Sequence, residues 1–352
     1  SYFQRHWRGS QYLQIALLQS INNYLQYFEK ENIIKKNVKR LIIYQHLGIL
    51  MAFGDRCDGK QIRTLSNYRR VYPFVMKTRT ESAIYADFEL EVGKTLEYMG
   101  KVNSGLSEKK VKFFHIFLAS LVRTVAMRPQ LNRFVMGRRL FQRNKIQISM
   151  IVKKKLDEES EYSNIKITFD PRDTLDVVIR RMAESLDYGR GDEKKHEEKE
   201  IDLLIKFPDI ILRFIIWVWR GLDYYGILPA SIVKDDPMYA SVYVTNLGSL
   251  GLNSVFHHLF EYGNTSNFIA LGKIHKAPLV DENGELTIKD VVRLGYTLDD
   301  RISEGIYFVR AIELFKNFMQ NPEILENPPS EEDIKDYLDT TEDSNVRKKT
   351  MA

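Results

Sequence analysis

The chain has little of several residue types that mark specialised classes of protein. One cysteine, Cys57, in 352 residues excludes an intrachain disulfide framework and is typical of a reducing compartment. None of the seven histidines stands in the Cys/His spacing of a zinc site. A net charge of +5, from 52 basic and 47 acidic residues, is too small to indicate a nucleic-acid-binding protein. We therefore expect a cytoplasmic protein with no metal and no nucleic-acid partner.

Long uncharged apolar runs are also absent. The N-terminal sequence SYFQRHWRGS has no apolar core of the signal-peptide type. The most apolar stretch, Ile210–Leu228, contains Arg213, Arg220 and Asp223. Each charge costs about 2.5–3.5 kcal/mol near a bilayer centre, so this stretch is not expected to span a membrane.

Two interpretations of Ile210–Leu228 remain open. Apolar side chains share one face of a helix there: Ile211, Phe214, Ile215, Val218 and Leu222. The favoured interpretation is a helix buried on a sheet or against a neighbouring subunit. The alternative is a helix lying in a membrane surface, with Trp217 and Trp219 as interfacial anchors.

What the chain does have is the balance of a globular protein, with 44% hydrophobic and 28% charged residues. Residues 1–50 show helical periodicity, and Met51 leaves open that they are a non-native extension. Residues 51–70 are predicted to be a linker, because Gly54–Asn67 is polar and contains glycine. Residues 326–352 are polar and acidic and are expected to be disordered.

Helical and strand patterns mix along residues 71–325. Helices are predicted over Lys112–Met127, Asp173–Leu186 and around Phe308–Met319. Extended segments are predicted at Tyr72–Met76, Ala83–Leu90, Ile146–Val152, Ile165–Phe169, Ala240–Val244 and Val292–Leu298. The order lacks a regular βαβ rhythm, so we predict an α/β (α+β layered) fold rather than a doubly wound sheet.

Several candidate motifs indicate no site. The stretch GSLGLNS at 248–254 lacks the Lys-Ser/Thr of a phosphate-binding loop. His257 and His258 are adjacent, so their side chains diverge and do not share one metal. His196 lies in the charged stretch GRGDEKKHEEKE, Gly189–Glu200, and is expected to be solvated.

Three segments, taken in order, resemble the catalytic domain of the 2-oxoacid dehydrogenase acyltransferases, relatives of chloramphenicol acetyltransferase. The first is FFHIFLASLVRTVAMRPQLNRFV at 113–135, with a helix followed by a Pro-x-Leu-Asn turn. The second is YVTNLGSLGLNSVFHHLFEYGNTSNFIALGKI at 243–274, which is similar to the family's Thr-Ile-Ser-Asn-Leu-Gly strand. The third is LDDRISEGIYFVRAIELFKNFMQNPEIL at 298–325, which is similar to the family's Asp-His-Arg-x-x-Asp-Gly signature.

The resemblance implies a two-layer sandwich with a mixed sheet and helices on one face, formed by residues 71–325. It implies acyl transfer between a coenzyme A thioester and a thiol or hydroxyl acceptor, with no covalently bound cofactor. It also implies a homotrimer whose active site lies between two subunits. Residues 189–228, the charged loop and the helix after it, have no counterpart in the standard enzyme, and no lipoyl domain is evident.

The site residues transfer to this chain with three departures. The family's catalytic histidine corresponds to Asp300, its aspartate to Glu304, and its oxyanion-binding serine to Thr245. Arg301 and Gly305 match the signature. Aspartate is a weaker base than histidine by about 2.6 pKa units, so the resemblance predicts slow or lost acyl transfer.

Two functions remain open from the sequence. The first is an acyltransferase, active or weakened, with Asp300 as the base. The second is a non-catalytic homotrimeric scaffold or binding module, in which Asp300 is a turn residue paired with Arg301 or Arg310. A displaced base at His257, His258 or His275 is a further alternative.

Overall fold

The computed structural model describes residues 54–104, 110–153, 162–190, 207–280 and 283–341. The helical pattern predicted for residues 1–50, Met51 and most of the charged loop at 189–200 lie outside these ranges. One compact unit begins at Gly54 and contains all of the described residues.

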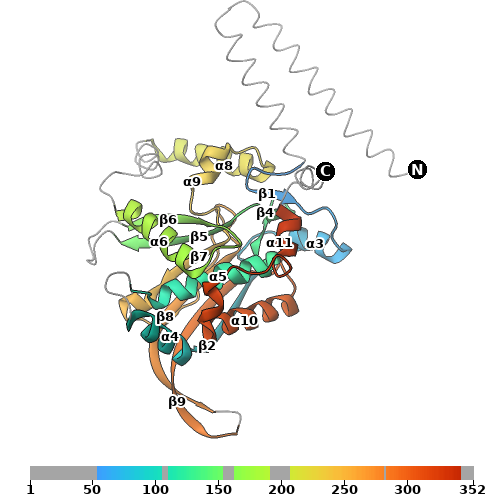
Figure 1. Cartoon of the computed structure of the whole chain (residues 1–352). Coiled ribbons are helices and arrows are strands. Elements are labelled where there is room, and N and C mark those ends of the chain that lie inside the picture. The colour runs from blue at the N-terminus through green and yellow to red at the C-terminus, as the bar shows by residue number, and fades with distance from the viewer. Residues whose placement is uncertain (1–53, 105–109, 154–161, 191–206, 281–282, 342–352) are drawn as a thin grey trace, which may run out of the picture. The chain divides into compact units, whose positions relative to one another are not determined.

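A six-stranded mixed sheet forms the centre of this unit, in the order β2-β9-β8-β7-β5-β6. Its strands are β2 (Ala83–Glu91), β5 (Ile146–Lys153), β6 (Tyr162–Phe169), β7 (Val242–Asn246), β8 (Asn267–Val280) and β9 (Leu286–Asp299). β7 pairs in parallel with β5 and β8, and the remaining pairs are antiparallel. The long β8–β9 ribbon extends beyond its neighbours (Figure 1).

Four helices cover one face of this sheet: α4 (Gly93–Ser104), α5 (Phe113–Met127), α6 (Leu175–Arg190) and α10 (Gly305–Gln320). α5 lies at the centre of this layer, and its residues from Ile116 to Ala126 are all buried (Figure 1). The core joins α5 and α10 to the alternate strand residues that face them, such as Val244 and Leu294. The predicted two-layer mixed fold is therefore confirmed, as are the predicted helices at α5, α6 and α10.

His115 helps to begin α5. Its Nδ1 accepts a hydrogen bond from the backbone N–H of Lys112 at 3.2 Å, which satisfies a donor at the start of the helix. Burial lowers the pKa of His115 to about 4, and the charge of Lys112 adds to this effect. The ring is therefore neutral in the folded protein at neutral pH.

This depressed pKa predicts a loss of stability in mild acid. An unfolded histidine titrates near pH 6.5, so between about pH 6.5 and pH 4 the unfolded chain binds a proton that the folded chain does not. Stability is full above the unfolded pKa and falls as pH drops towards the folded pKa. In His115→Gln, whose amide oxygen can accept the same hydrogen bond, we expect a weaker change of the urea midpoint between about pH 7 and pH 5. Equal pH slopes in the two proteins would contradict this role of His115.

A small antiparallel sheet, β1-β4-β3, lies beside the main one. It contains β1 (Gly59–Gln61), β3 (Arg133–Met136) and β4 (Arg139–Arg143). β1 lies within residues 51–70, so the prediction that this segment is a linker is wrong for Gly59–Gln61. Gly137 and Arg138 connect β3 to β4 with φ angles of 57° and 59°, as in a type I′ turn.

Two predicted segments differ in the structure. Residues 72–75, predicted to be extended, belong to helix α3 (Asn67–Val75), which follows Ser66, a residue type that favours helix starts. Helix α11 (Lys335–Thr341) lies in the tail that was expected to be disordered. Tyr337 and Leu338 of α11 are buried in the main core, which explains why this short segment is ordered.

The helix predicted at Ile210–Leu228 exists as α8 (Asp209–Tyr225). The prediction that it is buried on the sheet is wrong. Ile210, Phe214 and Trp217 are 77%, 62% and 71% exposed. Asp223 is its one buried residue, and the short helix α9 (Ala230–Asp235) follows it. In the ranges that the structure describes, no helix is both long and apolar enough to cross a bilayer.

A buried group of charges attaches α8 to the rest of the unit. Arg56 donates to Asp58 at 2.8 Å, and to the carboxylate and the backbone carbonyl of Asp223 at 2.9 and 2.7 Å. Tyr239 donates to the other oxygen of Asp223 at 2.8 Å. Burial opposes the ionisation of both carboxylates: it raises the pKa of Asp223, whereas Arg56 and Arg143 hold the pKa of Asp58 below its ordinary value.

Candidate functional site

The turn between β9 and α10 is fixed by an ion pair between two of its own residues. Arg301 donates from Nε and from one terminal nitrogen to the two carboxylate oxygens of Asp299, at 2.8 and 2.7 Å. Both side chains are buried, and Arg301 also donates to the backbone carbonyl of Met76 at 2.9 Å. Because this bidentate pair sets the path of the backbone, the position of residue 300 does not depend on its own side chain.

Asp300 is half-buried at this turn, and only its backbone takes part in the described hydrogen bonds. Its N–H donates to Ser82 at 2.8 Å, and its carbonyl accepts from Arg69 at 3.2 Å. Within the described ranges its carboxylate pairs with neither Arg301 nor Arg310, so the predicted turn pairing is wrong. Burial raises the pKa of Asp300; Asp299 adds to the rise and Arg69 opposes it. A carboxylate without a partner and with a raised pKa is suited to accept a proton.

Glu304 lies farther from this centre. It precedes the first residue of α10, and its side chain is 74% exposed. Its carboxylate is 3.8 Å from Nε of Arg69, the residue that also holds the carbonyl of Asp300. The structure therefore links Glu304 to Asp300 through Arg69 rather than directly.

Thr245 is not near Asp300 in one protomer. Thr245 of β7 pairs with Ala270 of β8, which pairs with Gly295 of β9. Asp299 lies four residues farther along β9, since 299 − 295 = 4. At the usual strand rise and spacing this is about 14 Å along the strands and about 10 Å across them. One protomer therefore does not bring the hydroxyl of Thr245 and the carboxylate of Asp300 to one substrate atom.

Residues 231–326 match the family model of the 2-oxoacid dehydrogenases acyltransferase (catalytic domain). The match contains both the strand with Thr245 and the turn with Asp300. The resemblance to this acyltransferase family is confirmed. The segment at 113–135 lies outside the matched residues, and a comparison with curated proteins finds no match.

Solved structures similar to this chain include acyltransferases. A probable dihydrolipoamide acetyltransferase from Listeria monocytogenes 4b F2365 has 13% identity and a TM-score of 0.49, over 75% of this chain and 95% of that one. A dihydrolipoamide acetyltransferase from Azotobacter vinelandii has 10% identity and a TM-score of 0.48, over 76% and 94%. A chloramphenicol acetyltransferase has 11% identity and a TM-score of 0.46, over 75% and 98%.

The Thr-Asn-Leu-Gly segment of the acyltransferase match is a tight turn. Asn246 accepts a hydrogen bond from the N–H of Ser249 at 3.1 Å and begins a short 3-10 helix, Leu247–Leu250. A Cβ on Gly248 would lie 2.4 Å from the carbonyl oxygen of Gly272, so only glycine fits there. Gly248 thus serves close backbone packing, and Gly251 ends the 3-10 helix with a φ of 77°.

The candidate displaced bases lie on or near the second face of the sheet, opposite the helices. The His257 ring stacks on Phe268, with centroids 4.0 Å apart, and the His257 carbonyl accepts from Thr297 at 2.6 Å. Nδ1 of His257 is 2.7 Å from the carbonyl of His258, and because a carbonyl only accepts, Nδ1 is the donor of this pair. His275 lies on the β8–β9 ribbon, beyond the position of Thr245.

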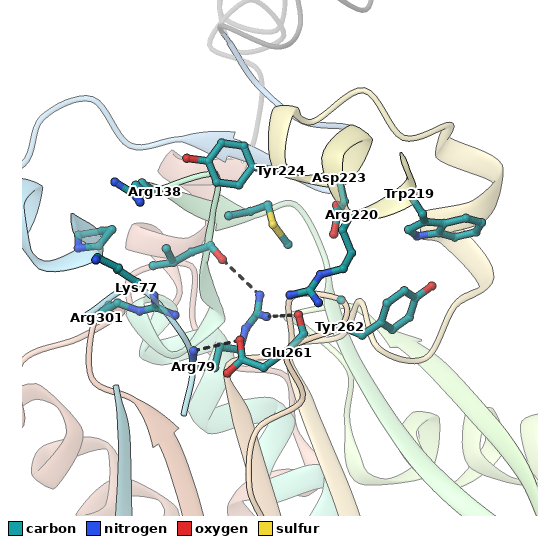
Figure 2. Close-up of a pocket in the computed structure, with 15 residues that line it drawn as sticks. Lys77, Arg79, Arg138, Trp219, Arg220, Asp223, Tyr224, Glu261, Tyr262 and Arg301 are labelled. Atoms are coloured by element: carbon teal, nitrogen blue, oxygen red, sulfur yellow. Dashed lines mark hydrogen bonds between the residues drawn. The ribbon is translucent and has the colours of Figure 1, made fainter. Parts of the chain in front are cut away.

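A cavity that the acyltransferase signature does not predict lies beside Arg301 (Figure 2). Its volume is about 210 Å³, and α3, the β3–β4 turn, α8 and residues 261–263 supply its lining. The basic residues that line it are Lys77, Arg79, Arg138, Arg220 and Arg301. They are far apart in the sequence, and no motif joins them. Across the described ranges, no group of three or more His, Cys, Asp or Glu residues could hold a metal ion.

Proposed function

We propose that this protein transfers an acyl group from a coenzyme A thioester to a thiol acceptor, with Asp300 as the general base. The observation that supports this best is the turn at Asp299–Arg301, where an ion pair fixes the backbone and the carboxylate of Asp300 has no hydrogen-bond or ion-pair partner among the described residues. Asp300 takes the proton of the acceptor thiol as its sulfur attacks the thioester carbonyl. The C–S bond to coenzyme A then breaks, and the proton returns to the departing thiolate.

Thr245 has the second role in this proposal. Its hydroxyl donates a hydrogen bond to the negatively charged oxygen of the tetrahedral intermediate. Because Thr245 and Asp300 lie far apart in one protomer, the two groups come from neighbouring subunits of a homotrimer. An exposed apolar patch supports such an interface: the rings of Tyr85 and Phe256 lie 5.7 Å apart, and they and Val255 are 49%, 50% and 53% exposed.

The proposal is tested with acetyl-CoA and a dithiol acceptor such as dihydrolipoamide, by chromatographic measurement of free CoA. We expect slow but enzyme-dependent release that Asp300→Asn reduces to the uncatalysed rate. His257→Gln is the matched control, and we expect it to keep its turnover, because the His257 ring is packed on Phe268. Full activity in Asp300→Asn together with loss in His257→Gln would transfer the role of base to His257.

The alternative proposal is a non-catalytic homotrimeric scaffold or binding module, favoured by the exchange of histidine for Asp300. It predicts a trimer in sedimentation with no CoA release above background and no rise of Tm with coenzyme A. Enzyme-dependent turnover lost in Asp300→Asn would exclude it.

The oxyanion role of Thr245 gives a sharper prediction. Thr245→Val keeps the shape of the side chain and removes the donor, and loss of one such donor lowers kcat by about 10²–10³-fold. KM is expected to change little, because the hydrogen bond forms in the transition state. Thr245→Ser keeps the donor and serves as the control. Equal kcat values in the valine and serine variants would exclude this role.

Mixing two inactive variants tests the shared site. If Asp300 and Thr245 of one site come from different subunits, random trimers of Asp300→Asn and Thr245→Val subunits regain intact sites. At equal amounts about a quarter of the sites contain both native groups, so we expect about a quarter of the wild-type activity after co-expression. No recovery from trimers that contain both subunits would contradict the intersubunit arrangement.

A further inference from the structure

The cavity beside Arg301 has a strong excess of positive charge. Five basic residues line it, against two acidic ones, Asp223 and Glu261. Figure 2 shows these side chains arranged around one space, with Arg79 at its base. An enclosure of one charge sign focuses the electrostatic field and attracts a ligand of the opposite sign.

Both carboxylates are held by other groups, and among the cavity cations their charges act on Arg79. Asp223 accepts from Arg56 and from Tyr239, one at each oxygen. Glu261 accepts from the N–H and the hydroxyl of Thr80 at 2.9 and 2.8 Å. Burial by itself raises the pKa of Glu261, but these hydrogen bonds hold it below the ordinary value. Both acids thus have hydrogen-bond partners other than Lys77, Arg138 and Arg220.

Three of the cations form no ion pair within 4.0 Å among the described residues, although the charge of Lys77 acts on the exposed Glu81. Lys77 and Arg220 make no side-chain hydrogen bond or ion pair there, and Arg138 contacts only the ring of Phe74, 5.4 Å from its centroid. Arg301 differs, because Asp299 neutralises it. The cavity therefore presents one lysine and two arginines able to bind an anion.

Arg79 adds a buried donor at the base of the cavity. Its side chain is 5% exposed, and its guanidinium donates to the carbonyls of Val135, Phe260 and Glu261 at 3.2–3.3 Å. Its Nε–H is buried without a partner in the part of the chain that the structure describes. A buried donor left unpaired destabilises the protein, and a bound acceptor would remove this cost.

Arg138 occupies a position that costs stability. It has a φ of 59°, and it is the one residue other than glycine with a positive φ in the described ranges. The left-handed conformation is strained for a residue with a Cβ, and glycine or asparagine is the usual choice there. Arg138 gains no ion pair in return among the described residues, so its presence at this turn indicates a role for its charge.

From these observations we infer that the cavity binds a phosphate-bearing ligand through Lys77, Arg138 and Arg220. Guanidinium groups bind phosphate oxygens in pairs of parallel hydrogen bonds, and lysine adds a compact charge. A volume of 210 Å³ equals that of about seven water molecules at ~30 Å³ each, which is enough for a diphosphate group. This inference uses α8 and the β3–β4 turn rather than Asp300 and Thr245, so its failure would leave the acyl-transfer proposal standing.

The phosphate group could belong to a soluble metabolite or to a lipid headgroup, and α8 makes both sources worth testing. Its apolar side chains Ile210, Phe214 and Trp217 are largely exposed on the helix that also supplies Arg220. A phosphate-bearing membrane surface would contact these side chains and the cavity together. A soluble ligand would need the cavity alone.

Calorimetric titration of the full chain with sodium pyrophosphate at constant ionic strength tests the inference. We expect saturable binding that weakens at least tenfold in Arg220→Gln. Arg213→Gln is the matched control, because it removes the same charge from the same helix at a residue outside the cavity lining. Equal weakening in both variants would show general charge attraction and would overturn the inference, as would the absence of binding to both pyrophosphate and vesicles.

Vesicles identify the source of the phosphate. Phosphatidylcholine vesicles with and without phosphatidic acid are sedimented with the protein. Binding that requires phosphatidic acid, competes with pyrophosphate and is lost in Arg220→Gln assigns the cavity to a lipid headgroup. Pyrophosphate binding without vesicle binding assigns it to a soluble ligand. Vesicle binding that persists in Arg220→Gln, without pyrophosphate binding, would overturn the inference.

Arg138→Gly separates binding from folding. Glycine is favoured at a φ of 59°, so this variant is expected to raise Tm while it weakens pyrophosphate binding about tenfold or more. A residue with only a structural role would not show this opposite pair of effects. Unchanged binding in a stabilised Arg138→Gly protein would exclude Arg138 from the ligand site.

Discussion

Asp300→His is expected to increase acyl transfer by up to a few hundred-fold. A thiol of pKa about 8.5 loses its proton to histidine at a cost of about 2 pKa units, and to an ordinary aspartate at about 4.6. The difference is about 3.5 kcal/mol, or a few hundred-fold in rate. Burial raises the pKa of Asp300 and so reduces this gain. The gain in rate is measured as single-turnover release of CoA from acetyl-CoA.

Asp300→His is well suited to measurement because the conformation of the turn does not depend on the side chain of residue 300. Asp299 and Arg301 hold the backbone, so the variant should unfold at the same urea concentration as the wild type. The pH profiles should also differ, because activity rises through the pKa of the base: an ordinary histidine titrates at about pH 6.5 and an ordinary aspartate at about pH 3.9, and burial raises the pKa of Asp300. A folded histidine variant no faster than the wild type would remove residue 300 from the reaction.

Asp223→Ala is expected to cost the folded protein about 3–5 kcal/mol of unfolding free energy, because it removes one partner of a buried ion pair. Arg56 would keep Asp58 but lose an acceptor at 2.9 Å, and Tyr239 would lose its acceptor at 2.8 Å. Both donors are buried, so water does not readily replace the carboxylate. Urea unfolding followed by circular dichroism gives the change.

Asp209→Ala is the control for this experiment. Asp209 lies in the first turn of the same helix and is exposed, so its loss should cost about 0.3–1 kcal/mol through the helix dipole. Asp223→Asn, which keeps an acceptor for Tyr239 or Arg56, should fall between the two. If alanine at 223 costs no more than alanine at 209, the buried charges do not hold α8 in place.

Local patterns predicted the elements whose side chains have a single regular environment. The helical spacing of apolar residues at Lys112–Met127 predicted α5, and the alternation of apolar residues at Ile146–Val152 predicted β5, because one face of each element packs on the core. β1 was missed because three residues hold no periodicity and its pairing with β4 is nonlocal. α8 was predicted as a helix, but its apolar stripe does not reveal whether a partner covers it, and here it is exposed.

In the candidate site, too, the sequence predicts residues that lie in short motifs and misses contacts between distant segments. Asp300, Arg301, Glu304 and Thr245 could be named because each lies in a short motif. The sequence does not show that Arg301 pairs with Asp299 rather than with Asp300, because both carboxylates stand next to each other just before Arg301. The basic cavity was missed because Lys77, Arg138 and Arg220 are separated by more than 60 residues, and each alone resembles a solvated charge.

The ion pair between Asp299 and Arg301 has a consequence for how this protein can change. Its two neighbours hold residue 300 in place, and Asp300 contributes backbone hydrogen bonds alone, which any residue except proline can supply. Chemistry and folding are thus separable at this position. Evolution, or a saturation library at codon 300, can sample acids, bases and inert side chains in turn without first repairing the scaffold.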